Sequence, residues 1–479
     1  MPEMFLKRAS ATDVASTAPP AGAAGAEGLD LLRIGAVRSL VRWAGFPDLL
    51  QIAMLIVFIG LAVASWGVFS PEGANAKLFA KANLATLLIW GLWWPVMIWT
   101  AVLFGRVWCA VCPLEWVSAV CESTGRRMGF LQRPLRRWIV SGTIIVALYA
   151  LIQLLVAGAH IHRVPAYTSY FLIGLLGLAA ITGFFFKGRA FCRGFCPVGV
   201  ILNIYGRGGM VAVRPGATEA GHGTPVDAHT CPSLLNPSKL ASNANCLVCG
   251  HCLKTAAPGQ MRLLLRPPFP TNGARKIAAS WPITVFVMLV SGFVIGELFT
   301  EWADGNKVFL AVPMWGAARV GASAHAGWFE GVWALGVVPL VLWSALGGIL
   351  WAFGHRQRIG GLWRQMALPM AVIVAAGHMS KGLAKLVSWA PFVPGALQDP
   401  DGIATAQAIS SRAITAPAPW LSVVAVAMIA VALIAAAFVF AVREFRLARG
   451  AHAFHASAAV PLALVAIGFV GIVVGWPYR

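Results

Sequence analysis

The chain has 479 residues, of which 59% are hydrophobic and only 11% are charged, and its mean hydropathy is +0.76. About a quarter of the residues of a soluble domain are charged, so this composition excludes an ordinary soluble protein and indicates a membrane protein. The formal net charge of +20 does not indicate nucleic-acid binding, because the basic residues of membrane proteins gather in cytoplasmic loops.

Residues 1–48 are predicted to lie on the cytoplasmic side of the membrane. Residues 1–28 are rich in Ala, Pro, Gly, Ser and Thr and lack the continuous apolar core of a secretory signal, which is typical of a disordered tail. From Leu31 to Trp43, apolar residues alternate with arginines at helical spacing. This pattern predicts an interfacial helix that lies on the inner membrane surface and anchors the chain.

Nine predominantly apolar stretches follow, each close to the roughly 20 residues that a helix needs to cross the hydrocarbon core of a bilayer. They predict an all-α polytopic membrane helix bundle. A four-helix membrane core occupies residues 49–186, a cytoplasmic segment 187–276, and five further membrane helices 277–479. The nine stretches are 49–68, 83–105, 138–158, 167–186, 277–299, 330–353, 366–391, 419–442 and 457–476.

The distribution of basic residues predicts the orientation of these helices. With the N-terminus in the cytoplasm, 28 of the 37 Lys and Arg residues fall on the cytoplasmic side and 7 on the other, while Lys381 and Lys385 lie within the seventh span. Short loops rich in Lys and Arg stay in the cytoplasm. The chain is therefore predicted to be a multi-pass protein with a cytoplasmic N-terminus.

A cysteine motif occurs twice, each time at the predicted cytoplasmic end of a helix. Residues 105–113 and 188–197 both contain Gly-Arg-x-aromatic-Cys and then Cys-Pro. The first cysteines of the two copies, Cys109 and Cys192, are 83 residues apart, and both copies follow an apolar span in the same direction. Parallel repeats of this kind can face each other across a pseudo-twofold axis along the membrane normal.

The four cysteines of the two motifs have three interpretations. They can converge to hold a 4Fe–4S cluster, form two thiol pairs for disulfide exchange, or be inert buried thiols. Arg106 and Arg189 precede the first cysteine of each copy by three residues, where a cation stabilises the negative charge of thiolates or of a cluster. These arginines argue against inert packing. The four cysteines are Cys109, Cys112, Cys192 and Cys196.

A third cysteine group lies in the predicted cytoplasmic segment. Cys246, Cys249 and Cys252 have the Cys-x2-Cys-x2-Cys spacing that brings three soft ligands onto one loop, as a cubane cluster requires. Cys231 is the predicted fourth ligand, since closing a loop of 14 intervening residues costs little chain entropy. The competing metal is zinc, but a zinc ribbon normally pairs two Cys-x2-Cys knuckles. We therefore predict a 4Fe–4S cluster at this group.

With these motifs the chain resembles the membrane-bound ferredoxin-like proteins related to NapH, NosR and the oxidase-assembly protein CcoG. Their signature is Gly-Arg-x-aromatic-Cys-x3-Cys-Pro at a helix end, usually twice, followed by a cytoplasmic ferredoxin-like segment. Residues 188–197 fit it fully, whereas residues 105–113 have one residue fewer between their cysteines. The resemblance spans roughly residues 80–260. It implies a bacterial inner-membrane protein that moves electrons between the quinone pool or cytoplasmic donors and periplasmic reductases, or that assists metalloenzyme assembly.

The last five predicted spans have no counterpart in the minimal architecture of that family. In the seventh span, His378, Lys381 and Lys385 are spaced i, i+3 and i+7 and so share one helix face. Ionisable groups inside a membrane by default indicate a pathway or a binding site, and this stripe is a candidate quinone site. Glu297 and Glu301, at the outer end of the fifth span, are the expected counter-charges. The alternative is that Lys385 snorkels outward and that His378 only hydrogen-bonds a neighbouring helix.

Two classes of function follow from the sequence. The first is an integral membrane iron–sulfur protein that passes electrons between the quinone pool or a cytoplasmic donor and a periplasmic or membrane redox partner, as a quinol dehydrogenase-type component does. The second is a metalloenzyme assembly factor or a transporter with a metal- or redox-sensing cysteine segment. The eight grouped cysteines favour the first. Haem is not favoured, because nothing in the spacing of His160, His162 and His325 in the outer loops demands it.

Overall fold

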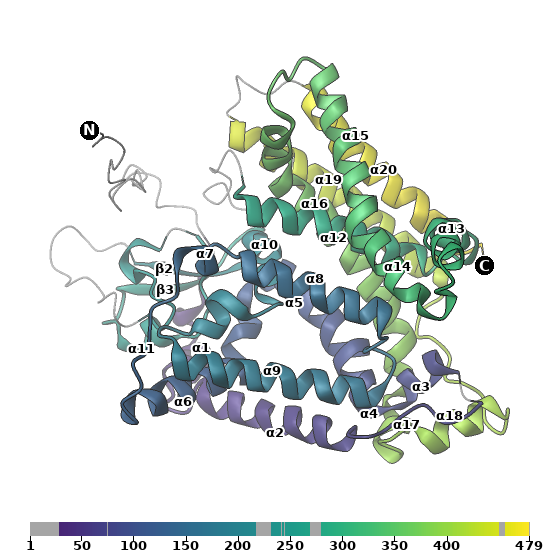
Figure 1. The fold of residues 1–479 in the computed structure, drawn as a ribbon. Coiled ribbons are helices and arrows are strands. Elements are labelled where there is room, and N and C mark those ends of the chain that lie inside the picture. Colours follow the sequence, from purple (N-terminus) through teal and green to yellow (C-terminus); the bar gives the residue numbers. More distant parts are fainter. Residues whose placement is uncertain are drawn as a thin grey trace, which may run out of the picture.

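The computed structural model of the chain is almost entirely helical, with one small sheet at one end (Figure 1). The disordered tail predicted within residues 1–28 lies outside the described residues, apart from Gly28. The described residues are 28–73, 75–216, 231–240, 242–243, 245–268, 279–449 and 456–478.

Six helical segments among the described residues are long and apolar enough to cross a membrane. Three shorter apolar helices, α2 (Asp48–Ala64), α8 (Thr143–Gly158) and α20 (Val460–Val474), coincide with the remaining predicted spans. The prediction of an all-α polytopic membrane protein is therefore confirmed. The six longer segments are Leu84–Phe104, Pro165–Phe185, Trp281–Phe299, Ser323–Ala352, Ile359–Gln398 and Val423–Arg446.

The helix α16 (Ile359–Trp389) is the central helix of the bundle. Every residue from Met366 to Ser380 is buried, and α16 packs against α5 (Trp94–Phe104), α12 (Trp281–Phe299) and α19 (Val423–Arg449). A helix that is apolar on all sides is typical of a position enclosed by other helices. The ionisable stripe of α16 consequently lies in the interior of the helix bundle.

A second set of helices packs beside this group. α2, α6 (Pro113–Arg127) and α9 (Pro165–Phe185) contact one another, and α5 joins this set to α16 (Figure 1). On the other side, α8 packs against α14 (Ala326–Val332) and α12, while α15 (Val338–Ala352) packs against α12 and α16. The first cysteine motif leads into α6, which packs against α9 and against the turn η4 (Phe191–Phe195) of the second motif, so this arrangement brings the two motifs together.

The small sheet was not predicted from the sequence. Its strand order is β1-β3-β2 and all pairs are antiparallel, with β1 (Leu29–Asp30) and β2 (Val211–Pro215) on either side of β3 (Met261–Leu265). The short helices α1 (Gly35–Arg42) and α11 (His251–Thr255) share an apolar core with it. The segment for which an interfacial helix was predicted therefore contains a helix, α1, and its Val41 packs against the sheet module.

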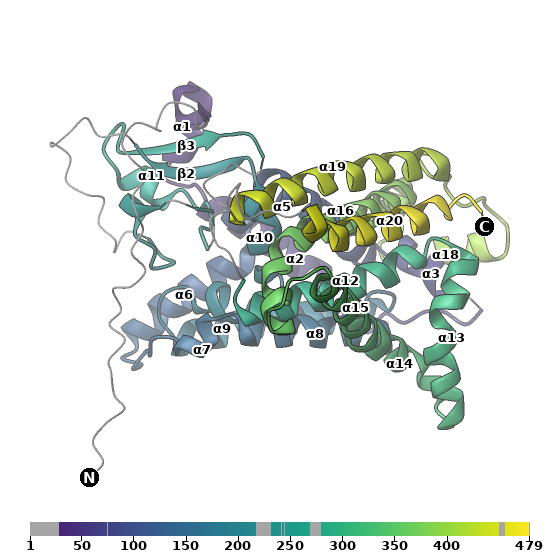
Figure 2. The same ribbon diagram turned by 90° about the horizontal axis from the view of Figure 1, so that it is seen from above.

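Short helices gather at the far end of the molecule from the sheet. Figures 1 and 2 both show α3 (Ala76–Ala82) and α18 (Ile403–Ser410) at this end, where they contact each other. The amide of Asn83 donates to the carbonyl of Asp401 at 3.0 Å and its Oδ1 caps the next helical turn. The helix α13 (Ala303–Arg319), also distant from the sheet in Figure 2, was not predicted either.

Candidate iron–sulfur centres and polar cavity

The first cysteine motif is a tight turn between α5 and α6. Gly105 follows α5 with a φ of +78°. This conformation is unfavourable for residues that have a side chain, but glycine adopts it readily. A 3-10 turn, η3 (Arg106–Val111), then holds Cys109, and Cys112 is extended. Pro113 is the first residue of α6. Proline fits this position because a backbone N–H there would have no partner within the helix. The Cys-Pro pair thus marks the start of a helix.

The second motif follows the same path with a wider turn. Gly188 has a φ of +73°, and a π turn, η4 (Phe191–Phe195), holds Cys192. Cys196 is extended and leads into α10 (Gly199–Tyr205). The extra residue between the cysteines of this copy explains why its turn has the wider π geometry instead of the 3-10 geometry.

Side chains of α6 join the two motifs. The carboxylate of Glu122 accepts hydrogen bonds from the backbone N–H groups of Gly188 (3.0 Å) and Arg189 (3.2 Å). The guanidinium Nε of Arg189 lies 2.6 Å from Oε1 of Glu115, whose other oxygen accepts from the amide of Gln51 at 2.7 Å. The helix after the first motif therefore holds the backbone and the arginine of the second.

The four thiols of the two motifs converge. Burial raises the pKa of Cys196 to about 11, and the charge of Cys109 adds to this effect. Burial, followed by the charges of Cys196 and Cys109, raises the pKa of Cys112. Burial also raises the pKa of Cys192, to which Glu115 and the other three thiols contribute. Cys112, Cys192 and Cys196 pack against one apolar cluster, and Cys192 also packs against the cluster that contains Cys109, so the structure brings together the four predicted cysteines.

The arginines of the two motifs have different surroundings. Arg106 is 5% exposed and hydrogen-bonds Cys109, and its Nε has no hydrogen-bond partner among the described residues. Although burial disfavours its charge, the neighbouring cysteines, Cys109 first, raise the pKa of Arg106. Arg189 instead pairs with Glu115. The predicted cation beside the thiols is therefore Arg106, while the charge of Arg189 is already balanced.

The structure also brings Cys231 to the cysteine triplet. Cys231, Cys246, Cys249 and Cys252 line one small pocket next to the sheet. Burial and then the neighbouring thiols raise the pKa of Cys252 to about 12, and burial is also the largest cause of the pKa of about 12 at Cys249. Gly250 has a φ of +76°, which lets the loop turn around these side chains.

Two charged side chains, Arg106 and Glu115, act electrostatically on cysteines of both thiol groups. The pKa of Cys246, which burial raises, also responds to Arg106, and the pKa of Cys249 responds to Glu115. Residues of the Cys-Pro motifs therefore reach the triplet electrostatically, and the two groups are neighbours. Within the described ranges, no group of three or more His, Cys, Asp or Glu side chains is positioned to hold a single metal ion.

A polar cavity of about 580 Å³ lies beside the C-terminal part of α16. Its wall includes all three residues of the predicted stripe and both predicted counter-charges. The helices α5, α12 and α16 contribute to it near their ends remote from the cysteine motifs. Among the lining residues are Trp94, His162, Arg163, Glu297, Glu301, Glu330, His378, Lys381 and Lys385.

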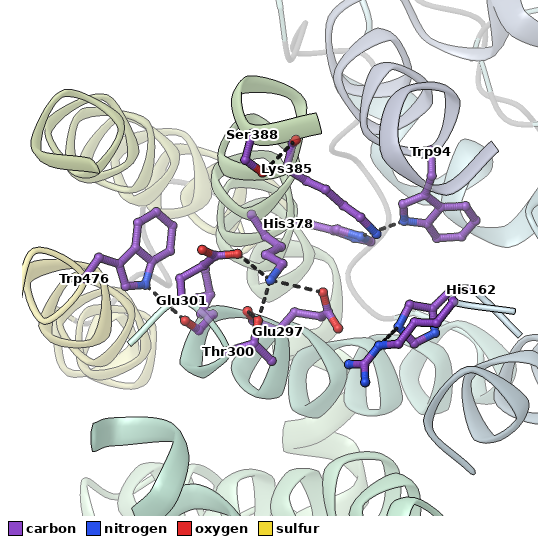
Figure 3. Close-up of polar contacts among 12 residues, drawn as sticks. Trp94, His162, Glu297, Thr300, Glu301, His378, Lys385, Ser388 and Trp476 are labelled. Atoms are coloured by element: carbon purple, nitrogen blue, oxygen red, sulfur yellow. Dashed lines mark hydrogen bonds and ion pairs between the residues drawn. The ribbon is translucent and has the colours of Figure 1, made fainter. Parts of the chain in front are cut away.

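Lys381 forms the ion pairs that the sequence predicted. Its ammonium lies 2.8 Å from Oε1 of Glu301 and 3.6 Å from Oε2 of Glu297, and it also hydrogen-bonds the hydroxyl of Thr300 (Figure 3). The side chain of Lys381 is 11% exposed. The side chain of Lys381 therefore points into a polar cluster inside the bundle.

His378 joins the cavity wall to the second cysteine motif. Its Nε2 accepts a hydrogen bond from the indole of Trp94 at 3.3 Å, and its Nδ1 lies 3.4 Å from the hydroxyl of Tyr205. An indole N–H can only donate, so a neutral His378 carries its proton on Nδ1 and donates it to Tyr205. Tyr205 ends α10, the helix that begins just after Cys196.

The remaining polar groups of the cavity are less fully paired. The ammonium of Lys385 lies 4.9 Å from the ring centroid of Trp389, a cation–π contact, and has no hydrogen-bond acceptor among the residues that the structure describes. His162, expected in a solvated loop, instead lines the cavity and accepts from Nε of Arg163 at 3.0 Å. Burial, then the charge of Lys385, lowers the pKa of His162 well below its usual range.

Sequence reasoning missed Trp94 and Tyr205 as partners of His378. They lie 284 and 173 residues from it along the chain, and no local pattern indicates contacts of that range. A weak signal was present in the tryptophans clustered around residue 93 of an apolar span, since indole N–H groups in such places usually need a partner.

Comparison with known proteins finds a similarity to a ferredoxin-type protein. The chain is 23% identical over 231 residues to the methylamine utilization ferredoxin-type protein MauN of Paracoccus denitrificans (strain Pd 1222), and the alignment covers 42% of this chain and 81% of MauN. No protein-family model matches the chain, and no solved structure matches it.

Proposed function

We propose that this protein is an integral membrane iron–sulfur protein that transfers electrons between a quinone and a redox partner protein. The observation that supports it most strongly is the convergence of four largely shielded thiols from the two repeated motifs beside Arg106. The similarity to MauN, a ferredoxin-type protein, supports the same class of function.

The two thiol groups fit two 4Fe–4S clusters. Each has four cysteines, the number that a cubane needs, and each is mostly shielded from solvent. Burial disfavours free thiolates, and a cationic metal core removes that penalty. Arg106 balances the net negative charge of a thiolate-bound cluster. The first group is Cys109, Cys112, Cys192 and Cys196, and the second is Cys231, Cys246, Cys249 and Cys252.

The cavity fits the headgroup of a quinone. Its volume is within the range of small-ligand sites, and it offers a donor in Lys385 and carboxylates in Glu297 and Glu301 that can take up protons. We place the cysteine groups on the cytoplasmic face of a bacterial inner membrane, on the basis of the Lys and Arg distribution. The cavity then opens toward the periplasmic side.

The second candidate is an assembly factor or a transporter. The observation that favours it is the cavity itself, which lies among the C-terminal spans and has charged walls on the side away from the cysteines. In that case the cysteines would sense or bind metal without passing electrons. The two functions differ in the metal that the cysteines hold, so one measurement separates them.

The first prediction is the iron content of the protein purified without oxygen in detergent. We expect about eight irons and eight acid-labile sulfides per chain, with an EPR signal after reduction by dithionite, because each cubane holds four. Replacing Cys192 and Cys196 together by serine should lower the iron to about four, since it removes two ligands of one cluster.

The matched control is Cys121→Ser, which changes a cysteine of α6 outside both groups and should leave about eight irons. About four irons in the unaltered protein would limit the chain to one cluster. Zinc without sulfide would contradict the electron-transfer proposal and favour the assembly or transport function.

A further inference from the structure

Three tryptophans connect the polar cavity to the first cysteine motif. Trp94 lines the cavity and donates to His378. The ring centroid of Trp94 lies 6.2 Å from that of Trp93, and the centroid of Trp93 lies 6.0 Å from that of Trp108. Trp108 is bonded directly to Cys109 in the sequence. Both ring pairs have separations within the range of direct aromatic contact.

The local backbone explains how these rings meet. The segment η2 (Leu87–Trp93) is a π-helical stretch that ends at Trp93, and π segments are frequent at functional sites. Gly91 lies within this stretch, and a Cβ added to it would be only 2.3 Å from the ring of Trp389. The absence of a side chain at Gly91 therefore leaves room for that ring. After α5, the turn η3 brings Trp108 back alongside Trp93. Residues 15 positions apart along the chain therefore touch.

We propose that Trp94, Trp93 and Trp108 form the path along which electrons pass between the cavity and the cluster held by Cys109, Cys112, Cys192 and Cys196. Electron tunnelling weakens exponentially with distance, and it is fastest through bonded or closely packed conjugated groups. The three indoles are not oxidised themselves; they provide electronic coupling across the apolar interior of the span. This inference depends on the proposed function, which supplies both ends of the path.

The chemistry at the two ends balances. A hydroquinone in the cavity is oxidised to a quinone and releases two electrons and two protons. The protons pass to the carboxylates of Glu297 and Glu301 and then to water. The two electrons would pass singly along the indoles to the clusters that the two cysteine groups would hold, and two oxidised clusters would take up one electron each. Reduction of a quinone uses the same path in the opposite direction.

The test compares tryptophan variants of the full-length, iron-loaded protein. Oxidised protein is mixed anaerobically with a short-chain hydroquinone, and loss of the visible absorbance of the clusters is followed by stopped flow. Trp93→Leu and Trp108→Leu should each slow this reduction at least about tenfold, equivalent to about 1.4 kcal/mol of activation free energy. Trp93→Phe, which keeps an aromatic ring, should recover part of the rate.

The matched control is Trp99→Leu. Trp99 lies on the same helix and donates to the carbonyl of Met379 at 3.0 Å, but it is outside the ring series and the cavity wall. The clusters of the Trp99→Leu protein should be reduced at the same rate as those of the unaltered protein. Two readouts independent of the reaction accompany each variant: iron and sulfide content, and equilibrium dialysis of the quinone against iron-free protein. Both should be unchanged in Trp93→Leu and Trp108→Leu.

Unchanged reduction rates in Trp93→Leu and Trp108→Leu, with normal iron and quinone binding, would overturn the path and leave the proposed function intact. An unaltered protein that binds no quinone, or that has no cluster at the four cysteines, would overturn the proposed function together with the path. If Trp108→Leu loses iron because it adjoins Cys109, the comparison of Trp93→Leu with Trp93→Phe decides the question alone.

Discussion

Single side chains hold the charged groups of this protein in place inside the bundle. Lys381 lies between Glu297 and Glu301, and Arg189 is balanced by Glu115, which the amide of Gln51 also contacts. Removing one member of a buried ion pair leaves the other charge uncompensated, which is more costly than never having the pair. Each pair is therefore a place where a single substitution has a defined consequence.

Replacing Lys381 by methionine should destabilise the protein by about 2–3 kcal/mol, because two carboxylates then face each other in a largely buried cluster. The value is below that for a fully buried pair, since the side chains of Glu297 and Glu301 are 30% and 25% exposed. Thermal unfolding in detergent measures the change. Adding Glu301→Gln to Lys381→Met should recover part of the loss.

The control for this experiment is Lys307→Met. Lys307 pairs with Asp304 at 2.9 Å, but both side chains are largely exposed, so the change in stability should be too small to measure. Equal effects of the two lysine substitutions would mean that the polar cluster contributes no more than a surface ion pair.

At the residue scale, the sequence alone indicated which residues gather, but not all of the contacts that they make. The spacing of the cysteines indicated two groups of four, and the stripe on α16 indicated Glu297 and Glu301 as counter-charges; the structure gathers these residues. It did not predict that Arg106 and Arg189 would differ. The repeat makes the arginines equivalent in sequence, but only the first motif is followed by Glu115, which contacts the arginine of the other copy.

At the scale of elements, the N-terminal segment covers the cysteine triplet. Val41 of α1 packs with the sheet, and Phe46 lies over Gly250, where an added Cβ would be 3.1 Å from its ring. The ammonium of Lys254 in α11 hydrogen-bonds the carbonyl of Phe46. The segment therefore closes one side of the pocket that contains the second group of thiols.

Replacing Gly250 by valine should remove the second cluster only. The residue has a φ of +76°, which is unfavourable for a β-branched side chain, and the new side chain would collide with Phe46. Iron analysis should give about four irons per chain in place of about eight, since only one cubane then remains. Gly259→Val is the control for the positive φ, because Gly259 has a φ of +86° but open space around it. The Gly259→Val protein should retain both clusters.

The positions of the spans could be predicted because about 20 apolar residues have few alternatives to a membrane helix. The sheet could not. Its strand β1 has two residues, and β2 and β3 have five each, too short for a clear alternation of apolar and polar side chains. Its existence depends on pairing between segments distant in sequence, which is a tertiary contact.

At the scale of the whole molecule, the two proposed redox sites occupy opposite halves of the bundle. The cysteine triplet lies next to the sheet, and residues of α3 line the cavity. Figures 1 and 2 show α3 at the end of the molecule remote from the sheet. The proposed iron–sulfur centres would then also act as structural cofactors, because they would bind eight largely shielded cysteines that come from the turn after α5, from the turn after α9 and from the segment next to the sheet.

Removal of iron should therefore make stability depend on pH. In the iron-free protein burial raises the pKa of Cys196 to about 11 and those of Cys249 and Cys252 to about 12, whereas unfolded thiols ionise near about 8.5. A raised folded-state pKa means that the unfolded chain loses its protons first, so stability falls as the pH rises above about 8.5, by up to about 1.4 kcal/mol per thiol and pH unit.

Thermal unfolding of the iron-free protein between about pH 7 and about pH 9.5 measures this effect. The iron-loaded protein should show a much smaller decline, because its thiolates are already deprotonated and bound to metal. Equal pH dependence of the two forms would contradict the assignment of these cysteines as ligands.

The pairing of β1 with β3 also sets an order of events during synthesis. Leu29 pairs with Leu265, so the first strand leaves the ribosome long before its partner exists. At about 5–20 residues per second, this interval lasts about 10–50 seconds. Four membrane helices are made within it. The sheet module closes only after they have emerged, and the first four thiols pass through that time as part of an incomplete protein, exposed to oxidants and to whatever delivers iron.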